Sequence, residues 1–172
     1  MGSFISQKEE WNSMKVLVVF FTWKGHTERL AHALARKLGT EAIRIEPVVD
    51  PGKHIGRMGL KALLGGKAEI KPIKRDMSDI DHLVIATPVW SGNLPPYTRQ
   101  YLSDLSGCAG KNFSVLAEMG GSGAARVIQK AREILEAEGM EFVASIVTVE
   151  KDVEEGRFDT ILDEFAEKVQ AG

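Results

Sequence analysis

The sequence is poor in the features that mark several large classes of protein. It has one cysteine, Cys108, which excludes an internal disulfide. No apolar run approaches the roughly 20 residues needed to cross a bilayer. Residues 1–13 lack the apolar centre of a secretory signal. The single thiol and the missing leader together predict a cytoplasmic protein without a membrane span.

Charge of either sign is also not in excess. The chain carries 22 Lys and Arg against 24 Asp and Glu, a formal net charge of −2, which argues against a general nucleic-acid binder. The four histidines have no close metal-ligand spacing, so no metal site is predicted. Cys108 is followed six positions later by Ser114 instead of arginine, which excludes a cysteine-phosphatase loop and predicts an unreactive thiol.

What remains is the composition of one globular domain. The chain has 172 residues, of which 44% are hydrophobic, enough for a substantial core. Residues 1–13 have no periodicity and are interpreted as an N-terminal extension or a cloning remnant, with an ordered N-terminal arm as the alternative. The domain is therefore predicted over residues 14–172.

Short apolar runs alternate with helical patterns along this domain. Strands are predicted at 15–21, 41–46, 82–87, 112–118 and 142–149, and helices at 28–38, 97–105, 124–138 and 154–170. This alternation predicts an α/β three-layer sandwich around an open parallel sheet, because parallel strands need crossovers and the helical crossovers cover both faces. Residues 50–75 form a basic insertion with a short helix that ends at Gly65 and Gly66. Its cations are expected to face solvent, with a partner-docking surface as the alternative.

Three loops leave the carboxyl ends of predicted strands, where ligands of open parallel sheets bind. They span 22–27, 88–96 and 119–123 and are rich in Gly, Thr, Ser or Trp. Loop 22–27 leads into a helix whose first N–H groups are unpaired and attract an anion. Thr22 and Thr27 add hydroxyl donors, Lys24 adds a charge and Gly25 permits close wrapping. The alternative is that Thr27 only caps the helix and the loop binds nothing.

From Met14 onward the chain resembles the flavodoxin-like family of FMN proteins. The family's phosphate loop reads Ser/Thr-x-Thr-Gly-Asn-Thr, and this chain has Thr22-Trp23-Lys24-Gly25-His26-Thr27. The outer hydroxyls and the glycine are kept, whereas Lys24 and His26 depart from the usual Thr and Asn. The resemblance implies a five-stranded sheet of order 2-1-3-4-5, FMN as cofactor, and phosphate binding at this loop.

The resemblance also implies where the rest of the flavin lies. Residues Thr87 to Asn93 are similar to the family segment that frames the isoalloxazine ring, and Trp90 is the candidate for stacking on it. A core or rim position for Trp90 is the alternative. The glycines after Glu118 would bring backbone N–H groups to the pyrimidine edge. The implied cofactor-binding residues, with no catalytic side chain, are Thr22, Trp23, Lys24, Gly25, His26, Thr27, Pro88, Val89, Trp90, Ser91, Gly92, Asn93, Met119, Gly120, Gly121 and Gly123.

On this resemblance the expected function is to carry electrons between redox partners, with a redox protein or a small-molecule electron acceptor as partner, by a monomer or homodimer. An FMN-dependent NAD(P)H:quinone-type oxidoreductase is one alternative, favoured by the missing aromatic residue in loop 119–123. A flavin-free scaffold of the same fold is the other, since Lys24 and His26 alter the phosphate loop. The acidic C-terminal region is expected to face solvent or to steer a cationic partner.

Two other folds are excluded by their missing motifs. A receiver domain is excluded because Thr87, Pro88 and Val89 stand where its phosphorylated aspartate belongs. A dinucleotide-binding fold is excluded because no Gly-x-Gly-x-x-Gly follows the first predicted strand.

Overall fold

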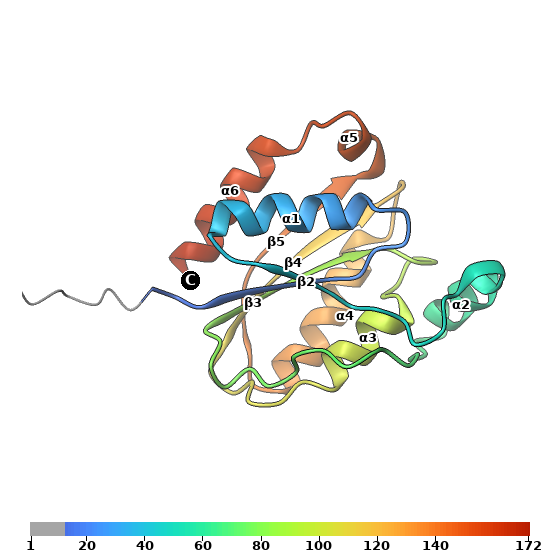
Figure 1. Ribbon diagram of the computed structural model, residues 1–172, viewed down its shortest axis with the longest axis horizontal. Coiled ribbons are helices and arrows are strands. Elements are labelled where there is room, and N and C mark those ends of the chain that lie inside the picture. The colour runs from blue at the N-terminus through green and yellow to red at the C-terminus, as the bar shows by residue number, and fades with distance from the viewer. Residues whose placement is uncertain (1–12) are drawn as a thin grey trace, which may run out of the picture.

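The computed structural model describes residues 13–172, so the predicted extension lies almost wholly outside the described residues. Figure 1 shows the order of the elements. In chain order they are β1 (Val16–Phe20), α1 (His26–Leu38), β2 (Ala42–Arg44), a short 3-10 helix η1 (Gly52–His54), α2 (Ile55–Leu63), β3 (His82–Pro88), α3 (Pro96–Ser103), β4 (Asn112–Met119), α4 (Ala124–Ala137), β5 (Glu141–Val149), α5 (Glu150–Glu154) and α6 (Asp159–Ala171).

All strands run parallel in the order β2-β1-β3-β4-β5, which confirms the predicted sheet. The inner strand β1 pairs with strands on both sides, and Val18 lies opposite Ala42 of β2 and Val84 of β3. All carboxyl ends therefore meet at one edge. Among residues 13–172, no helix combines the length and the apolar composition that a bilayer crossing requires.

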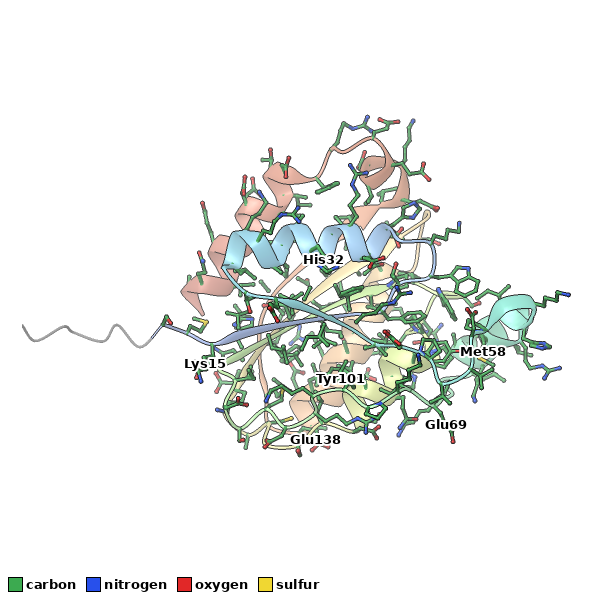
Figure 2. All side chains as sticks on the ribbon, in the orientation of Figure 1. Lys15, His32, Met58, Glu69, Tyr101 and Glu138 are labelled. Carbon is green, nitrogen blue, oxygen red and sulfur yellow. The ribbon has the colours of Figure 1, made fainter. Side chains whose placement is uncertain are left out.

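Helices cover both faces of the sheet, as the apolar strands require. Figure 1 shows α1, α5 and α6 on one side and α3 and α4 on the other. Successive residues of β1 point to opposite faces: Val18 and Phe20 pack with Leu34 of α1, and Val19 packs with Tyr101 of α3. Tyr101 lies within the α3 and α4 half of the molecule in Figure 2. The protein thus has two apolar cores separated by the sheet.

The C-terminal helix differs from the prediction. The helix predicted over 154–170 is confirmed from Asp159 onward as α6, but its predicted start is wrong: α5 ends at Glu154, and residues 155–158 form a turn before α6. Gly156, with φ 71°, lies between them in the left-handed conformation that ends helices. Val153 before this break and Leu162 after it pack into the same core. The apolar spacing continues across the break, so only the glycine marks it in the sequence.

The insertion forms η1 and α2, which project beyond the carboxyl edge of the sheet in Figure 1. The predicted short helix is confirmed, and Met58, labelled in Figure 2, packs toward the core. Leu60 and Leu63 of this helix, and Leu64 directly after it, are exposed. The insertion is therefore an arm of the domain and has no core of its own.

Candidate cofactor-binding site

Loop 22–27 forms a tight turn ahead of α1. Gly25 adopts φ 93°, and its N–H donates to Oγ1 of Thr22 at 3.0 Å. The first backbone hydrogen bond of the helix runs from Arg29 N–H to the Gly25 carbonyl at 3.1 Å. The N–H groups of the intervening helical residues therefore have no partner within the helix. These donors and the positive end of the helix are the elements of a phosphate site.

Thr27 does not cap this helix. The N-cap is Gly25, no side chain completes the cap, and Thr27 is the second helical residue. The capping interpretation is therefore wrong. The Thr27 side chain is buried, and its hydroxyl donates to Oε2 of Glu118 at 3.5 Å.

A cavity of about 150 Å³ lies at the carboxyl edge above these groups. Eight of the residues predicted from the sequence line it, together with two that were not predicted, Glu118 and Glu150. The eight are Thr22, Trp23, Lys24, His26, Thr27, Pro88, Val89 and Trp90. Residues from two predicted loops are thus brought to one site.

The second loop is held by a two-residue turn. The N–H of Trp90 donates to the Asn93 carbonyl at 3.0 Å, and the N–H of Asn93 returns a bond of 2.9 Å. Between them Ser91 and Gly92 have φ of 48° and 69°, the signature of a type I′ turn. The Asn93 amide oxygen accepts from Arg99 and from the next backbone N–H, each at 2.9 Å. Asn93 therefore fixes the loop instead of lining the cavity.

Trp90 is both packed and accessible. Its ring lies edge-on to Phe21 at 5.3 Å and to Tyr97 at 6.2 Å between centroids. Trp23, 38% exposed, lies edge-on to it from the other loop at 6.2 Å. The indole of Trp90 is thus anchored on the core while it forms a wall of the cavity. This anchoring is what a rigid stacking surface for a planar ring requires.

A second cavity, of about 340 Å³, adjoins the first. The two share Trp23, Val89 and Trp90 as walls. Ile55, Gly56 and Gly59 of α2 close its other side, and Ser91 completes it. The basic insertion therefore contributes its glycine-bearing face to the site, which the sequence pattern did not indicate.

The third loop approaches the second one without lining either cavity. Gly123, with φ 96°, precedes α4, and a β-carbon on it would lie 2.9 Å from Cα of Gly92. Met119, Gly120 and Gly121 also lie outside the linings of both cavities. Loop 119–123 thus supports loop 88–93 from behind.

Two glutamates, Glu118 and Glu150, line the first cavity. Glu118 is 7% exposed, and burial raises the pKa of its carboxyl. Nδ1 of His26 lies 3.9 Å from Glu118 and 3.5 Å from Glu150, while Nε2 lies 3.4 Å from Glu154. Lys24 Nζ lies 3.1 Å from Glu150. The two residues that depart from the family's loop pattern thus face carboxylates from β4 and α5.

His26, Glu150 and Glu154 offer ligand-type atoms that all lie within 4.8 Å of one another. The histidine spacing in the sequence did not indicate this group, because His26 is more than 120 residues away from the two glutamates.

A model of the NADPH-dependent FMN reductase family matches residues 14–154, which include every residue that lines either cavity. The chain belongs to this family. Its fold is flavodoxin-like and FMN-binding, and FMN is the family's cofactor. The match begins two residues before β1 and ends with α5.

Solved structures support the same fold for this family member. A protein from Bacteroides uniformis that is described as a putative flavoprotein is 16% identical with a TM-score of 0.71, over 90% of this chain and 99% of that one. A flavoprotein solved in complex with FMN from Lactobacillus acidophilus is 19% identical with a TM-score of 0.66, over 83% and 97%. An NADH:FMN oxidoreductase in its apo form is 15% identical with a TM-score of 0.62, over 92% and 88%.

The residues present fit FMN in two respects. The α1 N-terminus with Gly25 offers backbone donors to a phosphate, and the indole of Trp90 offers a fixed apolar wall to a planar ring. One feature is unfavourable to a doubly charged phosphate, namely the carboxyl of Glu118 beside Thr27. The site therefore suits FMN in shape and donors, and its charge needs a separate account.

Proposed function

We propose that this chain is an oxidoreductase that holds FMN across the two adjoining cavities and passes electrons from NAD(P)H to an acceptor. One observation carries the proposal: the N-terminus of α1 and the anchored indole of Trp90 border the same cavity, within the segment that matches the FMN reductase family. When bound, FMN supplies the redox chemistry, because it accepts a hydride and releases electrons.

The chain's own residues have binding and positioning roles in this proposal. Backbone N–H groups at the start of α1 and the Thr22 hydroxyl hold the phosphate. Trp90, fixed by Phe21 and Tyr97, sets the position of the ring. The cavity beside α2 leaves space for a nicotinamide or a small acceptor to approach, since its glycines at 56 and 59 carry no side chain.

A second candidate function is a flavodoxin-type carrier that exchanges electrons with a protein. The surface of α6 supports it, because Asp163, Glu164 and Glu167 are exposed there and would attract a cationic partner. Asp163 also pairs with Lys37 at 2.6 Å, which reduces this field.

Steady-state kinetics separates the two candidates. The purified protein is loaded with FMN, and oxidation of NADPH and of NADH is followed at 340 nm with a benzoquinone as acceptor. The reductase predicts saturable turnover that depends on bound FMN. Absence of turnover with either nucleotide, in protein that binds FMN stoichiometrically, contradicts the reductase and favours the carrier.

A matched pair of variants tests the location of the site. Trp23→Leu removes a wall common to both cavities, whereas Phe142→Leu alters an aromatic residue that packs on Phe113. We expect weaker FMN binding and slower turnover only in the first variant. Equal effects of the two substitutions would contradict the assigned site.

A further inference from the structure

The phosphate seat contains a carboxyl that a doubly charged phosphate should disfavour. Glu118 lies near the end of β4, on the face covered by α1. Its side chain is buried, with 7% exposed, and it lines the cavity at the start of that helix. Its hydrogen-bond partner is the hydroxyl of Thr27, which belongs to the same helical turn as the free N–H groups. A phosphate held by those groups therefore lies close to Glu118.

Counting hydrogen-bond donors sharpens the conflict. The Thr27 hydroxyl can donate one hydrogen bond, and an ionised Glu118 accepts that bond. A phosphate oxygen in the seat then meets one acceptor in Glu118 and loses one donor in Thr27. A neutral Glu118 reverses both effects, because its own O–H becomes a donor and the hydrogen of Thr27 is released to the phosphate. Two donors are gained at the phosphate by adding one proton.

The neighbouring charges leave Glu118 as the group that must change. Lys24 is bound to Glu150, and His26 is shared among Glu118, Glu150 and Glu154 at 3.4 to 3.9 Å. Lys24 from the loop and the His26 ring from α1 thus face three carboxylates from β4 and α5 before any phosphate is added. Of the three, Glu118 is the least exposed, and burial raises its pKa. A further anion nearby raises the pKa again.

From this geometry we propose that Glu118 is a phosphate-binding residue that acts as a neutral carboxylic acid, so that FMN binding takes up one proton from solvent. The inference rests on the proposed FMN site. Glu118 donates its hydrogen to a phosphate oxygen, and the phosphate remains a dianion. A flavin without the phosphate leaves Glu118 ionised and bonded to Thr27. Glu118 is thus a specificity residue that links recognition of the phosphate to pH.

Calorimetry measures the proton directly. FMN and riboflavin are titrated into the full chain between pH 7 and 9 in buffers of different ionisation enthalpy, above the second pKa of a phosphate monoester, which is near 6. We expect uptake of close to one proton per FMN and of none per riboflavin. The FMN association constant should fall about tenfold per pH unit where free Glu118 is ionised and bound Glu118 is not.

Glu118→Gln keeps the shape and carries a permanent donor. We expect it to bind FMN without proton uptake and with an affinity independent of pH over this range. Glu138→Gln, near the opposite edge of the molecule from α5 in Figure 2, should keep the wild-type uptake. Proton uptake that persists in Glu118→Gln, or its absence in wild-type protein that binds FMN, overturns the inference and leaves the proposed function standing. Wild-type protein that binds no FMN overturns both. Even if the variant does not fold, wild-type protein that binds FMN without taking up a proton overturns the inference.

Discussion

Gly123 lies so close to Val89 that a β-carbon on the glycine would be 2.8 Å from Cγ1 of the valine. The glycine also has φ 96°, which a side chain disfavours. Gly123→Ala is therefore expected to lower the free energy of unfolding by about 1 to 3 kcal/mol and to weaken FMN binding by moving loop 88–93. Urea denaturation and calorimetry measure the two effects.

Gly121→Ala is the matched control for this prediction. Nothing lies within 4 Å of a β-carbon at Gly121, and its φ is not positive. We expect the unfolding free energy to change by less than about 0.5 kcal/mol. A loss in Gly121→Ala as large as that in Gly123→Ala would show that the close approach to Val89 is not the cause.

Trp90 is expected to determine flavin affinity through its ring. Trp90→Leu keeps an apolar side chain but removes the planar surface anchored on Phe21. We expect FMN and riboflavin to bind at least tenfold more weakly, because stacking is lost for both, which corresponds to about 1.4 kcal/mol. Fluorescence titration of the flavin measures this change. If the variant binds each flavin as tightly as the wild type does, Trp90 is a packing residue only.

A buried leucine and an exposed leucine together test the core between α1 and the sheet. Leu34 of α1 is fully buried, whereas Leu64, after α2, is 76% exposed. Leu34→Ala should lower the unfolding free energy by about 2 to 5 kcal/mol. Leu64→Ala should change it by less than about 0.5 kcal/mol. Denaturant unfolding of both variants checks the difference, and similar losses would contradict the assignment of Leu64 to the surface.

His82 is expected to make the fold sensitive to acid. It is fully buried, its Nε2 lies 2.9 Å from Oγ of Ser114, and burial lowers its pKa from 6.5 to about 4. The folded protein therefore favours the neutral ring, and the unfolded chain binds the proton first as pH falls. The neutral His82 ring therefore adds to the free energy of unfolding above pH 6.5. This contribution, up to about 3 kcal/mol, is lost as the pH falls from 6.5 to 4.

The comparison for this prediction is His82→Gln, which removes the titrating ring. Its free energy of unfolding should be lower at pH 7 but should decline less steeply toward pH 4. Chemical denaturation at half-unit pH intervals measures both slopes. Parallel pH profiles for the two proteins would exclude His82 as the source of acid sensitivity.

The sheet and its crossovers could be predicted because the inner strands β1, β3 and β4 are largely apolar and are buried on both sides. Val16 to Phe20 forms such a run. The order of the strands in the sheet, by contrast, was predicted from the resemblance to flavodoxin-like proteins and not from the residues. The division of the C-terminal segment could not be predicted from spacing, since Val153, Phe158 and Leu162 keep facing one core across the turn at Gly156.

The site was predicted in part, and the missing part has a physical reason. Loop 22–27 follows a strand and precedes a helix, so its donors could be expected from local sequence. Glu118 and Glu150 reach the same cavity only through the order of β1, β3, β4 and β5, which no local pattern specifies. Alternation along β4 gave one usable signal, because Glu118 shares the face of Leu116, and that face packs on α1.

Lys24 and Glu150 are 126 positions apart in the chain and form a direct bond at the cavity mouth. A ligand seated there contacts both the loop that leads into α1 and the start of α5, which follows the last strand of the sheet. Ligand binding should then raise the melting temperature of the whole domain in one cooperative transition, by an amount that grows with the logarithm of ligand concentration. Thermal shift thus becomes a rapid screen for whatever nucleotide the protein prefers.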